Sequence, residues 1–136
     1  MKQLVSDISF KESDGKLAEM FSTKAEKMAK LLNDKDKKEN KEYEPDISTT
    51  QYRKFYEKIL ELNYKAQNLT HDEFNIRVLP FVKMINSKVQ YSNTRGNSGL
   101  NFVALMEKSI KAVNSKEELQ NFKYFLEAII GYMPKK

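Results

Sequence analysis

Apolar residues recur every three or four positions along this chain, in stretches that open with a residue able to cap a helix. This spacing is that of one face of an α-helix, and no stretch alternates convincingly with the two-residue period of a strand. Ser48, Thr70 and Ser115 are each followed three positions later by Gln or Glu, the pattern of a capping box. The sequence therefore predicts an all-α fold.

The apolar stripes predict about five helices, and their mostly short connections favour a compact antiparallel bundle. The helices should span about residues 14–32, 48–68, 70 to the turn at 96–99, 99–113 and 115–133, with a kink or short break at Pro80 and Ser98 as the fourth cap. The residues expected to face the core are Leu17, Phe21, Ala25, Met28 and Leu32, then Tyr52, Phe55, Ile59, Leu62 and Ala66, then Val82, Ile85 and Val89, then Leu100, Val103, Met106, Ile110 and Val113, and finally Leu119, Phe122, Leu126, Ile129 and Met133.

The 136 residues are expected to form one helical domain over 1–136, since domains usually contain roughly 100 to 200 residues. Residues 33–46, NDKDKKENKEYEPD, are highly charged and lack a helical period. We expect a mobile loop there.

Enzymatic chemistry has little to build on in this sequence. There is no cysteine and a single histidine, His71, in the first turn of a predicted helix, where exposure to solvent is usual. One histidine without cysteine cannot make a typical zinc site, and the glycines of 96–99 lack the pattern of a phosphate-binding loop. We expect a protein that is not an enzyme and has no metal or cofactor.

No membrane segment is expected. The longest stretch without charge, 96–106, has 11 residues, against the roughly 20 that a spanning helix needs. Asp7, Lys11 and Glu12 interrupt any apolar run near the first residue, so no secretion signal is expected there. These features favour a cytoplasmic protein.

The positive charge is concentrated where acids are missing. The formal net charge is +5, and no Asp or Glu occurs from residue 74 to 106, although Arg77, Lys83, Lys88 and Arg95 do. On a helix, Lys88, Tyr91 and Arg95 fall within about 60° of one another, and Lys88 and Arg95 lie about 10 Å apart along the axis. This spacing suits contact with separate phosphates of a nucleic acid, although a solvated helix face would have the same composition.

A second basic group is expected on the helix over 48–68. Arg53 and Lys54 project away from its apolar stripe, and Lys58 continues the row below Lys54. An ordinary surface with ion pairs such as Glu61 to Lys65 would look the same. Tyr91 could stack on a base or ribose, or equally dock against a neighbouring helix or subunit.

Three blocks of sequence are similar to a known family. They are STTQYRKFYEKIL at 48–60, VQYSNTRG at 89–96 and FKYFLEAIIGYM at 122–133. Their order and spacing resemble the small subunit of the type III-A CRISPR effector, the Csm complex.

The resemblance implies a compact, non-catalytic helical subunit for antiviral defence. Such a subunit would contact guide RNA and target single-stranded RNA without sequence specificity, beside the backbone and large subunits and further copies of itself. The implied RNA-binding positions are Arg53 and Lys54 in the first block and Tyr91 and Arg95 in the second.

Two alternatives remain at this stage. One is a helical assembly or scaffold protein that binds a partner protein rather than RNA. The other is a small DNA-binding regulator with a helix-turn-helix, although the turn at 96–99 between two long helices is more typical of a bundle hairpin.

Overall fold

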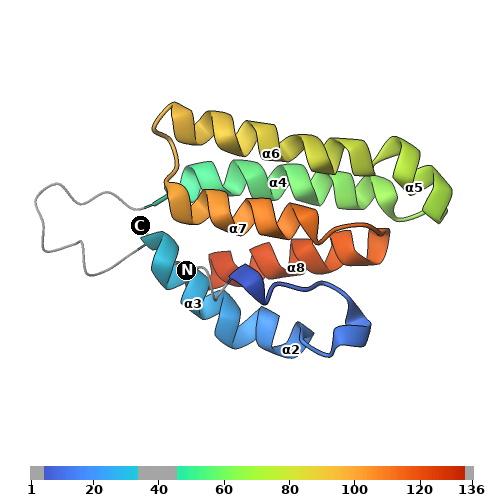
Figure 1. Cartoon of the computed structure of the whole chain (residues 1–136), viewed down its shortest axis with the longest axis horizontal. Helices are drawn as coiled ribbons and strands as arrows, with labels where there is room; N and C mark the ends of the chain where they lie inside the picture. Colours follow the sequence, from blue (N-terminus) through green and yellow to red (C-terminus); the bar gives the residue numbers. More distant parts are fainter. Residues whose placement is uncertain (1–4, 34–45, 134–136) are drawn as a thin grey trace, which may run out of the picture.

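The computed structural model describes residues 5–33 and 46–133, and it confirms the predicted all-α fold (Figure 1). Within these residues there is no strand beyond an isolated bridge between Ile47 and Ser98. The elements are a 3-10 helix η1 (Glu12–Asp14), α2 (Leu17–Glu19), a π-helix η2 (Met20–Lys24), α3 (Ala25–Asn33), α4 (Thr49–Ala66), α5 (His71–Arg77), α6 (Leu79–Thr94), α7 (Leu100–Lys111) and α8 (Lys116–Tyr132). The loop predicted at 33–46 lies, apart from its two end residues, outside the described residues.

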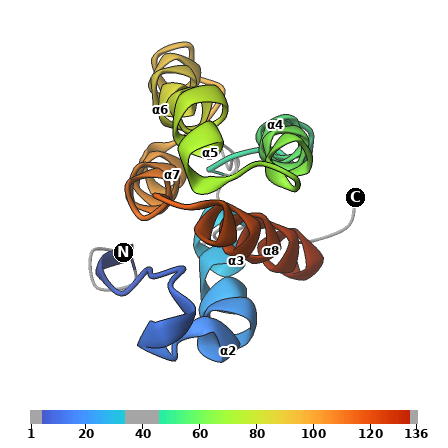
Figure 2. The same ribbon diagram turned by 90° about the vertical axis from the view of Figure 1, so that its right-hand side faces the viewer.

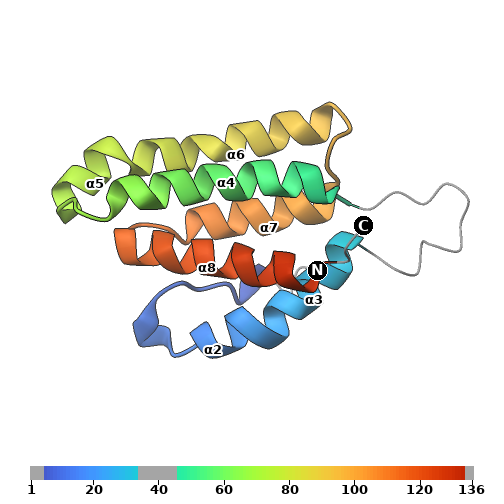
Figure 3. The same ribbon diagram turned by 180° about the vertical axis from the view of Figure 1, so that it is seen from behind.

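The long helices pack in pairs around α8 and α7. The end-on view in Figure 2 shows α4, α6 and α7 on one side of α8, with η2 and α3 on the other. Helix α6 packs mainly on α7, and α4 packs mainly on α8. Seen from behind, α4 and α6 run side by side along the molecule (Figure 3).

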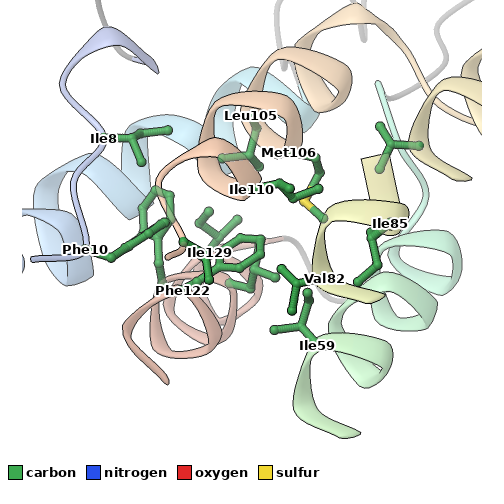
Figure 4. Close-up of a cluster of buried hydrophobic side chains, with 14 of the residues drawn as sticks. Ile8, Phe10, Ile59, Val82, Ile85, Leu105, Met106, Ile110, Phe122 and Ile129 are labelled. Atoms are coloured by element: carbon green, nitrogen blue, oxygen red, sulfur yellow. The ribbon is translucent and has the colours of Figure 1, made fainter. Parts of the chain in front are cut away.

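The core contains most of the predicted apolar stripes. Figure 4 shows Ile59 of α4 and Val82 and Ile85 of α6 pointing into one cluster with residues of α7 and α8. Phe10, which precedes the first predicted helix, also joins the core. The centroid of its ring lies 5.4 Å from that of Phe122. Burying such a side chain contributes about 1.5 to 3 kcal/mol.

Two residues of the predicted helix starting near 99 lie elsewhere than expected. Leu100 was expected in the core, but it is 75% exposed. Ser98 was expected to cap this helix, but Gly99 is its N-cap residue and supplies no side-chain hydrogen bond. The carboxylate of Asp46, a residue distant in sequence, caps this helix in place of Ser98.

The first predicted stripe changes register part of the way along. The π-helix η2 inserts a wider turn between α2 and α3, so Met20 is buried while Leu17 and Phe21 are only partly so. Ala25, Met28 and Leu32 are buried as predicted. A wider turn of this kind rotates the preceding residues about the helix axis.

The predicted helix starts at Ser48, Thr70 and Ser115 are confirmed, because each side chain accepts a hydrogen bond from the backbone three residues on. Thr70 and Glu73 form the complete reciprocal box. The kink or short break expected at Pro80 is confirmed as a short break, with α5 ending at Arg77 and α6 beginning at Leu79. Proline lacks the N–H that a continuous helix would use there.

Asp46, which lies shortly before α4, joins the end of α3 to the start of α7. Its N–H donates to the carbonyl of Leu32 at the end of α3 (2.8 Å), and its own carbonyl accepts from Gly99 (2.6 Å). Its carboxylate accepts from the N–H groups of Asn101 (3.2 Å) and Phe102 (2.6 Å), in the first turn of α7. A Cβ at position 99 would collide with this carboxylate, so a larger residue there would push the carboxylate out of its place.

Replacing Asp46 with alanine should destabilise the fold by about 1 to 3 kcal/mol, because two N–H groups of α7 lose their acceptor and the helix loses an N-terminal anion. Urea denaturation followed by circular dichroism measures this loss. Glu57→Ala, which removes an exposed carboxylate from α4, is the control and should change the free energy of unfolding by less than about 0.5 kcal/mol. Equal stability of the two variants would contradict the role of Asp46.

Tyr52 should make the fold sensitive to alkali. Its buried hydroxyl donates to the carbonyl of Leu126 (2.7 Å), and burial raises the pKa of Tyr52 well above its ordinary value of about 10. Above about pH 10, the Tyr52 hydroxyl of the unfolded chain releases its proton while that of the folded chain retains it. The free energy of unfolding therefore falls as the pH rises.

Tyr52→Phe should cost about 0.5 to 1.5 kcal/mol at neutral pH through the lost hydrogen bond. The difference from the wild type should then narrow above pH 10, as measured by urea denaturation across the alkaline range. Tyr64→Phe, on an exposed ring, is the control and should follow the wild type throughout. A constant gap between Tyr52→Phe and the wild type would refute the pH argument.

Candidate nucleic-acid interface

The buried and exposed faces of α6 place three of the predicted site residues together. Val82, Ile85 and Val89 are buried against the core. Lys83 reaches the end of α7, which identifies the flank of α6 that turns toward α7. The helical period of 100° per residue puts the exposed side chains of Lys88, Tyr91 and Arg95 on the opposite flank, beside α4.

Tyr91 and Arg95 form a pair on this flank. The guanidinium donates from Nη1 to the Tyr91 hydroxyl (3.3 Å), and its carbon lies 5.6 Å from the centre of the ring. The tyrosine itself is 63% exposed. Because a guanidinium has five N–H donors, this single hydrogen bond leaves Arg95 able to bind an anion.

Lys88 is exposed one helical turn before Tyr91. Within the described part of the chain, no carboxylate forms an ion pair with Lys88 or Arg95. The absence of Asp and Glu from 74 to 106 explains this, since neither cation has an acidic neighbour on its own helix. Both therefore contribute positive potential to the surface.

The basic residues of α4 divide between two flanks. Tyr52 bonds to α8, and Phe55 packs on Phe102 of α7 with ring centroids 5.1 Å apart, which orients the helix. By the helical period, Lys54 and Lys58 lie on the flank toward α6, whereas Arg53 lies about 100° from Lys54, nearer α8.

Lys58 is partly neutralised by its neighbours. Its ammonium lies 3.7 Å from Glu61, which also pairs with Lys65 at 3.5 Å. Such exposed pairs contribute at most about 1 kcal/mol and exchange readily with an external anion. Lys54 is exposed and has no ion pair with any described carboxylate. The structure thus brings Lys54 and Lys58 to the α6 side and leaves Arg53 apart.

Not every cation of the acid-free segment is available to a ligand. Lys83 donates to the carbonyls of Ile110 (2.8 Å) and Val113 (2.7 Å), at the end of α7. Desolvation by burial lowers the pKa of Lys83, and the charge of Glu118 raises it in part. Lys116 acts alike at the end of α4, donating to the carbonyl of Leu69 at 2.8 Å. Both lysines donate to carbonyls at or just beyond a helix C-terminus, where a positive charge is favourable.

Two exposed apolar side chains adjoin the basic residues on α6 and were not among the predicted site residues. Phe81 is 50% exposed and Met84 is 52% exposed. The steps from 81 to 84, 88, 91 and 95 are three, four, three and four, so all five lie along one flank. We name these five residues the α6 row: Phe81, Met84, Lys88, Tyr91 and Arg95. This spacing can be seen in the sequence. It does not identify Phe81 and Met84 as exposed, because the buried stripe of α6 has the same period.

His71 lies in the first turn of α5, exposed, with its Nε2 3.2 Å from the amide nitrogen of Asn75. No group of three histidine or acidic side chains gathers around a possible metal position in residues 5–33 and 46–133. Over the same residues, no helix is both long and apolar enough to span a membrane.

The described residues form a small helical protein with an exposed row of basic residues along one helix. A family model described as Csm2 Type III-A matches residues 16–133. The chain therefore belongs to the Csm2 family, the small subunit of the type III-A Csm complex. The match starts well before the first of the three motif blocks, so the family also includes α2, η2 and α3. No curated protein and no solved structure matches the chain.

Lys83→Ala should destabilise the fold by about 1 to 2 kcal/mol, because two carbonyls at the end of α7 lose a charged donor. Lys88→Ala removes the same charge five residues later on the same helix and should leave the free energy of unfolding within about 0.5 kcal/mol of the wild type. Thermal denaturation of the two variants in parallel distinguishes the structural lysine from the available one. Equal destabilisation would show that Lys88 also supports the fold.

Proposed function

We propose that this Csm2-family chain is a non-catalytic subunit that binds the backbone of guide and target RNA and bridges neighbouring subunits of the Csm complex in the cytoplasm. The observation that supports it is the exposed flank of α6, where Lys88 and Arg95 lie seven residues apart without an ion pair among the described residues. Lys54 and Lys58 extend this surface onto α4, and Arg53 adds a cation on the far flank.

Backbone recognition suits a subunit that has to accept any guide sequence. Lysine and arginine neutralise phosphates and release counterions, an interaction that is independent of base identity and weakens with salt. Three or four phosphate contacts by one copy would give a slope of log affinity against log salt of roughly −2 to −3. A single copy therefore binds weakly, and several copies held on one strand bind tightly through effective concentration.

The alternative of a helix-turn-helix DNA regulator receives no support from the packing of α6 and α7. These two helices pack along their lengths as a hairpin, joined by a turn in which Gly96 has a positive φ of 78°. A recognition helix would need one face free to enter a groove, at a steep angle to its partner.

Lys88→Ala combined with Arg95→Ala should lower RNA retention by the assembled complex and make the salt slope shallower by about 1.4, at roughly 0.7 per single-strand phosphate contact. The measurement is RNA recovered with the purified complex as a function of salt. Lys27→Ala combined with Lys30→Ala, on the exposed side of α3, removes the same charge and is the matched control. RNA retention that falls equally in both variants, or in neither, would contradict the assignment of this surface.

A further inference from the structure

The α6 row is more apolar than phosphate binding requires. Phe81, Met84 and Tyr91 are each at least half exposed, on a surface with no described covering element. Phe81 and Met84 precede Lys88 along the row, and Tyr91 lies between Lys88 and Arg95. Exposed apolar side chains that gather along one line indicate a binding surface. A row of lysines alone would serve for phosphates, so the three apolar side chains require a ligand with apolar faces of its own.

RNA offers such faces only where it is unpaired. In a duplex the bases are stacked inside and the outer surface is ribose and phosphate, whereas an unpaired strand can present its bases to aromatic side chains. Along α6, Phe81 and Tyr91 are about 15 Å apart at the 1.5 Å rise of a helix. This length corresponds to about four nucleotides at the 3.4 Å spacing of a stacked strand.

The contact between Tyr91 and Arg95 prepares the row for stacking. The hydrogen bond and the position of the guanidinium at 5.6 Å from the ring restrict both side chains before a ligand arrives. A side chain that is already ordered loses less entropy on binding. The planar guanidinium can itself stack on a base while its remaining donors bind phosphate.

A protein partner fits the row less well than RNA does. Lys88 is the middle residue of the row and Arg95 is the last, so a protein covering the row would have to desolvate a lysine at its centre. Lysine is depleted in protein interfaces, and charged residues are depleted in their buried cores. An RNA strand, in contrast, supplies phosphates and bases in alternation.

Resting on the proposed function, we infer that the α6 row selects unpaired RNA, with bases packed on Phe81, Met84 and Tyr91 and phosphates held by Lys88 and Arg95. Cation binding alone would not distinguish a single strand from a duplex. The apolar members of the row therefore confer a preference for single strands.

The test uses the full-length chain at low salt and two fluorescently labelled probes, an unstructured RNA of about 16 nucleotides and the same strand annealed to its complement. Fluorescence anisotropy gives the affinity for each probe. The wild type should bind the single strand more tightly. Phe81→Ala combined with Tyr91→Ala should weaken single-strand binding by about tenfold or more and change duplex binding less than twofold, because the loss of stacking affects only unpaired bases.

Two further variants isolate the effect of the row. Leu60→Ala combined with Tyr64→Ala removes exposed apolar side chains from α4, where Tyr64 is 81% exposed, and should leave both affinities unchanged. Lys88→Ala combined with Arg95→Ala should weaken binding to both probes. Circular dichroism verifies that each variant is folded.

The outcomes separate the two proposals. Equal loss of single-strand and duplex binding in the Phe81 and Tyr91 variant, or no loss, overturns the preference while the proposed function stands. A wild type that binds neither probe at low salt overturns the proposed function, and the inference with it. The Phe81 and Tyr91 variant could also keep its RNA binding and yet fail to co-purify with the other Csm subunits. This result would assign the row to a protein partner and so overturn the inference.

Discussion

The hydrogen bonds of Asp46 are the interaction on which the arrangement of the helices depends. One residue fixes the end of α3, the entry to α4 and the first turn of α7, through its backbone and its carboxylate together. Asn101 strengthens the junction by donating to the carbonyl of Leu31 (3.3 Å). The turn between α6 and α7 ends at Gly99, which donates to the Asp46 carbonyl, so the junction also holds the end of this turn. The end of α6 itself is closed by local backbone bonds, such as the one from the Arg95 N–H to the Tyr91 carbonyl.

The basic residues of the C-terminal half have two separate uses. Lys83 and Lys116 donate to carbonyls at the ends of α7 and α4 and so hold neighbouring helices together. Lys88 and Arg95 lack carboxylate partners among the described residues and give the surface its charge. Net charge alone could not separate these uses, because Lys83 and Lys88 lie five residues apart on one helix. Their positions around the helix axis separate the two lysines, because Lys83 lies on the flank that faces α7 and Lys88 lies on the other flank.

The sequence predicted the helices and their starts well, because periodicity and capping are local properties. Ser48, Thr70 and Ser115 start helices as expected, and Pro80 ends one. The errors arose where a distant contact replaced a local one, or where the helix departed from its regular period. Asp46 took the capping role expected of Ser98, and the wide turn at Met20 shifted a stripe that a uniform period had placed otherwise.

The candidate site was predicted only in part, for a related reason. The positions of Lys88, Tyr91 and Arg95 on one exposed flank followed from the helical period, but whether this flank binds RNA stays a prediction. Phe81 and Met84 share the period of that flank, yet an apolar residue on a helix is ordinarily assumed to be buried. Recognising them as exposed required knowing that α7 covers the other flank of α6.

The hydrogen bond from Asp46 to Leu32 has one more consequence, for how the helices are held in register. The bond joins two residues 14 positions apart at 2.8 Å, donor to acceptor, and the carboxylate of the same aspartate reaches the first turn of α7. The relative placement of α3 and α7 therefore depends on a direct contact between their ends. A substitution that weakens this contact would let the two helix ends drift apart without touching the apolar core.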